Sequence, residues 1–146
     1  MKKTGSLDEV IALLIPPVSC VIVGEMGCLR LEGRGIKPLL EACHTKQAYF
    51  SNAFVADKII GKAAAGILAY MGVRQVYGEL MSEPAKQLLE RYHIPVQYKN
   101  LVPMIQNRAG TGMCPMENKV KSLNSAKEIF CVLDSFIKEI MTQNRG

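Results

Sequence analysis

The sequence predicts an α/β protein, a three-layer α/β/α sandwich on a mixed sheet of about five strands. Three observations predict this fold class. Two short apolar segments flank a turn at residues 24–27, which indicates a hairpin. Residues 52–98 then read strand–helix–strand–helix–strand, which implies parallel strands joined by right-handed crossovers. A helix with a regular apolar face follows from about residue 125.

The first elements follow from capping and β-branched residues. Ser6 and Glu9 have capping-box spacing, so a short helix should begin after Ser6 and end before residues 16–17, which are both Pro. β-Branched and alternating patterns then predict hairpin strands at 18–23 and 28–32.

The middle elements follow from turn and capping residues. A helix should span 38–44, because Pro suits a first turn. The third strand is expected at 52–56, and the next helix from Asp57 to Met71, with Gly72 just past its end.

The remaining elements are a strand at 73–80, a helix capped by Ser82, and a strand at 94–98. Residues 99–122 lack a clear period and are expected to form a long irregular loop, of the kind that often carries function. Ser125 then opens the final helix.

Length and composition describe one globular domain. The 146 residues predict a core over about 18–120 with terminal helices packed on it. The net charge of +5 favours a small anionic partner. Dedicated nucleic-acid binding is disfavoured, because the basic residues are scattered rather than grouped into a stripe.

The cysteines are predicted to be free thiols in a reducing cytoplasm. Their number is odd and none has CxxC spacing, so they are expected to form neither a disulfide framework nor a zinc site. Four of them, Cys20, Cys28, Cys43 and Cys131, are interpreted as core residues. The apolar segment 10–15 is too short for a signal peptide, and no segment reaches the ~20 apolar residues of a membrane span.

The junction at residues 55–65 is the strongest functional signal. Lys58 and Lys62 are four apart, which would put both on one helical face. With the free amides of the helix start they would form an anion site. They would also lower each other's pKa, making one a candidate base or nucleophile. In the alternative interpretation, Asp57 is a plain N-cap and Lys62 extends its ammonium to the surface.

Further candidates lie around this junction. Asp57 would orient a lysine or act as a base. Cys114 is a candidate nucleophile or a buried thiol, and Glu117 is a candidate salt-bridge partner of a lysine or a general acid. The other expected ligand-binding residues are Arg34, Gly61, Ser82, Glu83 and Arg108. Arg34 and Arg108 lie in Gly-containing segments that can equally be plain turns or surface loops.

Three motifs carry a resemblance over about residues 18–120, namely those at 33–38, 55–64 and 112–117. With the element order they resemble a small uncharacterised bacterial family, a domain of unknown function, within the cytidine-deaminase-like superfamily. The resemblance implies a cytidine-deaminase-like fold and a homo-oligomer. It implies no substrate.

The superfamily holds zinc with His and Cys ligands at two helix starts. Here those positions fall near Asp57 and at residues 82–85, which offer neither thiolate nor imidazole. No metal or other cofactor is therefore expected.

Two functions remain open. The first is a zinc-independent enzyme or former enzyme acting on a small anionic or nucleotide-like molecule, in a pocket between the helices that start at Asp57 and Ser82, roofed by the Cys114 loop. The second is a non-catalytic ligand-binding or regulatory module.

Overall fold

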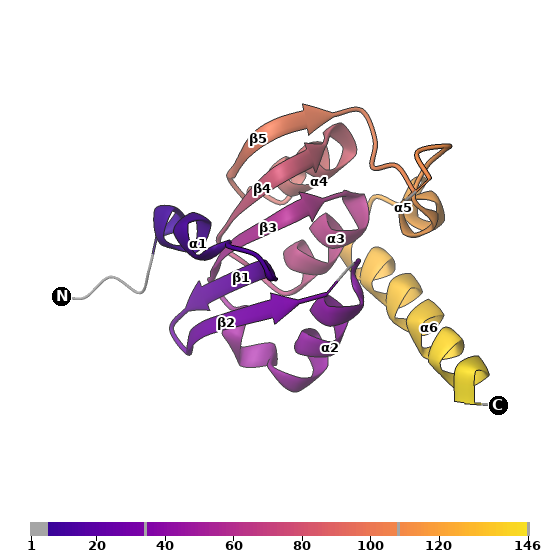
Figure 1. Ribbon diagram of the computed structural model, residues 1–146, viewed down its shortest axis with the longest axis horizontal. Coiled ribbons are helices and arrows are strands. Elements are labelled where there is room, and N and C mark those ends of the chain that lie inside the picture. Colours follow the sequence, from indigo (N-terminus) through magenta and orange to yellow (C-terminus); the bar gives the residue numbers. More distant parts are fainter. Residues whose placement is uncertain (1–5, 34, 108, 146) are drawn as a thin grey trace.

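The computed structural model describes residues 6–33, 35–107 and 109–145. Its centre is a mixed five-stranded sheet of order β2-β1-β3-β4-β5 (Figure 1). β1 is antiparallel to both β2 and β3, whereas β3, β4 and β5 are parallel. The strands are β1 (Val18–Gly24), β2 (Gly27–Glu32), β3 (Phe54–Ile60), β4 (Gln75–Ser82) and β5 (Val96–Val102).

The helices connect and cover these strands. They are α1 (Leu7–Leu13), α2 (Lys37–Thr45), the short 3-10 helix η1 (Gln47–Tyr49), α3 (Lys62–Tyr70), α4 (Glu83–Arg91), α5 (Pro115–Val120) and α6 (Ala126–Arg145). α3 and α4 are the crossovers between the parallel strands, as the sequence predicts. None of the described helices is long and apolar enough to cross a bilayer.

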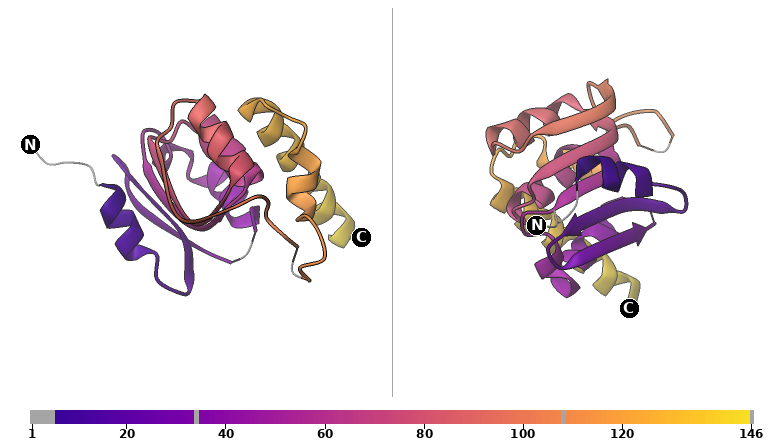
Figure 2. Two further views of the ribbon diagram at one scale, coloured as in Figure 1. Left: turned by 90° about the horizontal axis from the view of Figure 1, so that it is seen from above. Right: turned by 90° about the vertical axis from the view of Figure 1, so that its left-hand side faces the viewer.

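The two faces of the sheet are covered unequally. α1 lies on one face, and α3, α4 and α6 lie on the other (Figure 2). The larger core lies on the α3 side and includes Ile22, Val55, Ile67 and Leu133. The smaller core lies under α1. The α/β class and the mixed five-stranded sheet are confirmed. Among the described residues, α1 alone covers the second face of the sheet.

The expected helix from Asp57 to Met71 is wrong at its start. β3 continues through Asp57 to Ile60, and α3 begins only at Lys62. The reason is pairing on both sides, because Asp57 lies opposite Cys20 of β1 and Gly78 of β4. Asp57 is therefore no N-cap, and Lys58 and Lys62 do not share a helical face.

The expected irregular loop after residue 98 is also partly wrong. β5 extends to Val102, and α5 occupies residues 115–120. β5 is an edge strand with five consecutive exposed residues, so it lacks the apolar alternation by which strands are recognised. α5 has only six residues, too few to show an apolar period.

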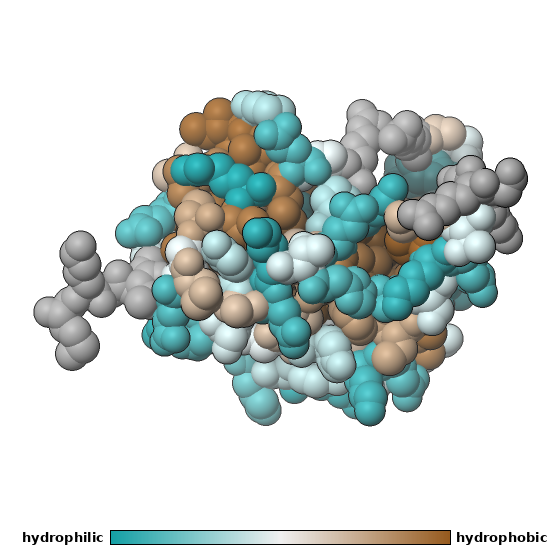
Figure 3. Space-filling view, turned by 90° about the horizontal axis from the view of Figure 1, so that it is seen from below, coloured by the Kyte–Doolittle hydropathy of each residue, from teal (hydrophilic) through white to brown (hydrophobic). Residues whose placement is uncertain are grey.

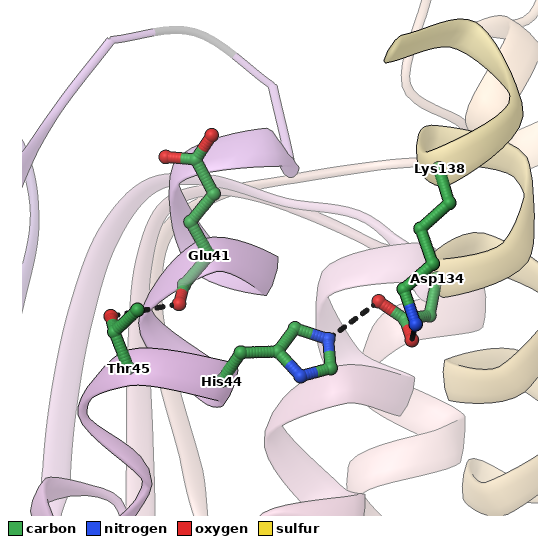
Figure 4. Close-up of polar contacts among 5 residues, drawn as sticks. All are labelled: Glu41, His44, Thr45, Asp134 and Lys138. Atoms are coloured by element: carbon green, nitrogen blue, oxygen red, sulfur yellow. Dashed lines mark hydrogen bonds and ion pairs between the residues drawn. The ribbon is translucent and has the colours of Figure 1, made fainter. Parts of the chain in front are cut away.

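α6 is joined to the body by close packing and by a polar contact. Gly66 of α3 faces the buried side chain of Ile129, against which an added Cβ would collide. On α2, His44 Nε2 lies 2.7 Å from Asp134 Oδ1, and Lys138 Nζ lies 3.2 Å from Asp134 Oδ2 (Figure 4). The packing of Ile129 on Gly66 and the contact between His44 and Asp134 hold α6 to the helical side of the sheet.

The surface seen from below alternates between hydrophobic and hydrophilic residues, with separate apolar patches (Figure 3). All five cysteines are free thiols. Cys20 and Cys43 are buried, but Cys28 and Cys131 are exposed, so their interpretation as core residues is wrong. Both lie on the solvent side of a strand or helix, an orientation that their residue type does not reveal.

The α3–α6 contact yields a testable prediction. Gly66→Ala should lower the free energy of unfolding by about 1–2 kcal/mol, because overpacking outweighs the helix propensity of Ala. Urea denaturation measures the change. Adding Ile129→Ala should make the double variant less destabilised than the sum of the single changes. Strict additivity would contradict the contact.

Candidate functional site

The start of α3 is built around Gly61. This residue is the N-cap of α3, and it has no side chain that could accept a hydrogen bond from the helix. The first amides of α3 must therefore find an acceptor elsewhere, because unpaired buried amides are costly.

Glu117 of α5 provides that acceptor. Lys62 N donates to Glu117 Oε1 at 2.6 Å, and Ala63 N donates to Glu117 Oε2 at 2.8 Å. Only 7% of Glu117 is exposed. A Cβ on Gly61 would collide with this carboxylate, so the site needs glycine for space.

The Glu117 carboxylate occupies the place where a helix start would bind an external anion. Burial raises the pKa of Glu117, while the amides of Ala63 and Lys62 and the Lys62 charge oppose that rise. The anion site predicted at the helix amides is thus filled by the chain's own carboxylate.

The Lys62 side chain points elsewhere. Its ammonium donates to the backbone carbonyl of Lys121 at 2.8 Å, just after α5, and forms no ion pair with Glu117. The residue is 7% exposed. Burial lowers the pKa of Lys62, the charge of Glu117 opposes this, and the charge of Arg91 lowers it further.

Lys62 and Arg91 line one recess of about 90 Å³. It lies between the start of α3, the side of α4 and the link from α5 to α6. Its lining residues are Lys62, Pro84, Gln87, Leu88, Arg91 and Asn124. The lining residues include two cationic residues and two residues with side-chain amides, and none of them is acidic. Within the described ranges, Arg91 has no ion-pair partner.

Asp57 forms a separate polar site on β3. Its Oδ1 accepts a hydrogen bond from Ile59 N at 3.1 Å, and the residue lies opposite Cys20 of β1. Burial raises the pKa of Asp57 to about 7, although the Ile59 amide and the nearby Cys20 thiol lower it. Burial and the Asp57 charge raise the pKa of Cys20 as well.

The other predicted residues are not gathered at one place. Lys58 is half-buried in β3, Ser82 is buried and caps α4 by accepting from Ala85 N, and Glu83 is exposed. Cys114 is the half-buried N-cap of α5, and no described hydrogen bond joins its thiol to a cation. Arg34 and Arg108, which were also predicted to bind a ligand, lie outside the described residues.

The two positions that correspond to the zinc ligands of the superfamily do not form a metal site. Asp57 is tied to its strand neighbours, and Glu83 is exposed on α4. Over the described parts of the chain, no three His, Cys, Asp or Glu side chains gather as a ligand set.

Gln87, Arg91 and Asn124 were not predicted from the sequence. A signal for two of them was present, because Pro84, Gln87, Leu88 and Arg91 recur at helical spacing on one face of α4. Asn124 had no such signal. Only the path of the link between α5 and α6 brings it to the recess.

The chain matches, over residues 13–137, the family described as Domain of unknown function (DUF1893), and it belongs to that family. It resembles the crystal structure of a DUF1893 family protein (TM1506) from Thermotoga maritima, with a TM-score of 0.78 and 24% identity. The match covers 92% of each chain and shows a shared fold. No curated protein matches this chain.

Glu117 yields the second prediction. Glu117→Ala should lower the free energy of unfolding by about 2–4 kcal/mol, because two buried amides lose charged acceptors. Gly61→Ala should act in the same direction, by about 1 kcal/mol or more, by displacing the carboxylate. Chemical denaturation measures both.

Two matched variants serve as controls. Glu139→Ala removes an exposed carboxylate of α6, and Gly112→Ala adds a Cβ whose nearest neighbour lies 3.9 Å away. Both should be close to neutral. Equal effects of Glu117→Ala and Glu139→Ala would contradict the capping role.

Asp57 yields the third prediction, on pH. The folded-state pKa of about 7 lies above the ordinary 3.8, so the protonated acid stabilises the fold at low pH. This contribution is lost as pH rises through about 7. Asp57→Asn should therefore raise the unfolding free energy by about 1–3 kcal/mol at pH 8 and hardly at pH 4.

The control is Asp8→Asn, which changes an exposed acid on α1. As a surface substitution it should be close to neutral at both pH 4 and pH 8. A pH profile of Asp57→Asn parallel to that of the unchanged protein would refute a titrating Asp57.

Proposed function

We propose that this protein is a small-anion-binding module whose ligand places an oxyanion group in the recess between α3 and α4. The observation that supports this proposal is that Lys62 and Arg91 both line one recess that no acidic residue lines. Burial lowers the pKa of Lys62, and the positive charge of Arg91 lowers it further. An anion between the two side chains would favour the charged form of Lys62 and reduce the repulsion between the two cations.

The chemistry of the lining supports a phosphate, sulfate or carboxylate group. An arginine offers a planar fork of donors and a lysine offers a compact charge, and both suit oxyanions. The amides of Gln87 and Asn124 add neutral donors. A volume of about 90 Å³ admits one such group or a few water molecules, while the rest of a nucleotide-like ligand would lie outside.

Binding is better supported than catalysis. The recess brings together cations and amides, whereas the candidate acid–base and nucleophilic groups lie elsewhere. Asp57, Cys114 and Glu117 do not line it, and Glu117 is engaged by two amides. The zinc-independent enzyme remains a hypothesis, which selective alkylation of Cys114 at neutral pH would support. A cytidine-deaminase-like ancestry, a homo-oligomer and a cytoplasmic location likewise stay predictions.

The fourth prediction tests the recess. Inorganic phosphate at millimolar concentration should raise the melting temperature of the protein, because a ligand that binds the folded state stabilises it. Arg91→Gln and Lys62→Met should each weaken phosphate binding by about tenfold, as one charged contact is lost. Differential scanning fluorimetry and titration calorimetry measure these effects.

Lys99→Gln, on exposed β5, is the control for general loss of positive charge. It should bind phosphate as well as the unchanged protein does. If Lys99→Gln and Arg91→Gln weaken binding equally, the effect is nonspecific screening and the recess is not the site.

A further inference from the structure

A second depression lies at the opposite end of α3 from the anion recess. It has a volume of about 670 Å³ and lies, largely open to solvent, between η1 and the end of α3. Its lining residues are Gln47, Ala48, Ser51, Tyr70 and Met71. This volume falls within the range of about 300–1,000 Å³ that small-molecule sites occupy.

Tyr70 gives this depression an aromatic wall. The residue is 45% exposed, whereas residues 62–68 of the same helix are buried. Its ring stacks on Phe130 of α6, with centroids 4.6 Å apart and planes inclined by 27°. The ring is thus held in place from behind while much of it stays open to solvent. A fixed aromatic ring is a surface on which a planar ligand can stack.

Two hydrogen-bonding side chains stand beside the ring. Gln47 and Ser51 are exposed, and neither side chain hydrogen bonds with another group in the described part of the protein. An amide and a hydroxyl offer both donors and acceptors to a ligand. Ala48 and the half-buried Met71 add apolar contact area.

The electrostatics of the depression differ from those of the recess. None of its lining residues is charged, and it lies at the C-terminal end of α3, where the helix dipole is negative. An anionic group is therefore disfavoured there.

We propose that the depression beside Tyr70 binds a planar, uncharged, nitrogen-containing aromatic ring, such as the base of a nucleoside. The base stacks on Tyr70, and its polar edge reaches Gln47 and Ser51. This site is independent of the proposed anion recess, because the two lie at opposite ends of α3 and share no lining residue.

The test uses nucleosides, which carry no phosphate. Adenosine, guanosine, cytidine and uridine are titrated into the full chain by saturation-transfer NMR and calorimetry, with ribose as the probe that lacks a base. At least one nucleoside should bind through its base protons, and ribose should not. Tyr70→Ala should weaken that binding about tenfold, and Tyr70→Phe should preserve it.

Matched variants separate the site from general effects. Tyr98→Ala removes a tyrosine of similar exposure, 39%, that does not line the depression, and it should leave binding unchanged. Arg91→Gln should also leave nucleoside binding unchanged, so failure here is distinguishable from failure of the anion recess. If Tyr70→Ala does not fold, Ala48→Phe, which fills the depression from an exposed position, should abolish binding.

Two results would overturn the proposal. One is that none of the four nucleosides binds at millimolar concentration. The other is that Tyr70→Ala, or a folded Ala48→Phe, binds as tightly as Tyr98→Ala does.

Discussion

The carboxylate of Glu117 on the first two amides of α3 is the contact on which this end of the molecule depends. It joins segments 55 residues apart in the chain. Without it, the start of α3 would have a glycine cap and unpaired buried amides. The same contact fixes α5 against the carboxyl edge of the sheet, where ligands of open α/β sheets commonly bind.

The position of α5 also determines where the ammonium of Lys62 lies. The carbonyl of Lys121, just after α5, holds the ammonium of Lys62, and the following link brings Asn124 toward α4. Glu117 is already engaged by amides, so the cations of the recess have no acidic partner among its lining residues. The Glu117 carboxylate thus accepts the hydrogen bonds of the α3 amides. In the proposed function, an external anion would instead contact the side chains of Lys62 and Arg91.

Local signals predicted most of the fold. Ser6 and Ser82 cap their helices as expected, Gly72 has the positive φ of a residue that ends a helix, and the crossover order produced parallel strands. The errors arose where tertiary pairing overrides local pattern. Charged residues near the end of β3 looked like a helix start, yet neighbouring strands on both sides extend it.

The candidate site divides in the same way. The sequence alone determined that a charge stands at the first turn of an apolar helix, and that Lys62 therefore needs a partner or a cavity. Only the tertiary structure decided which groups surround it. Glu117 and Lys121 lie on and just after α5, and Arg91 lies at the end of α4, so both segments are far from Lys62 in the chain. Their positions in the sequence do not predict that they lie close together, because the packing of whole helices brings them together and local conformational preference does not.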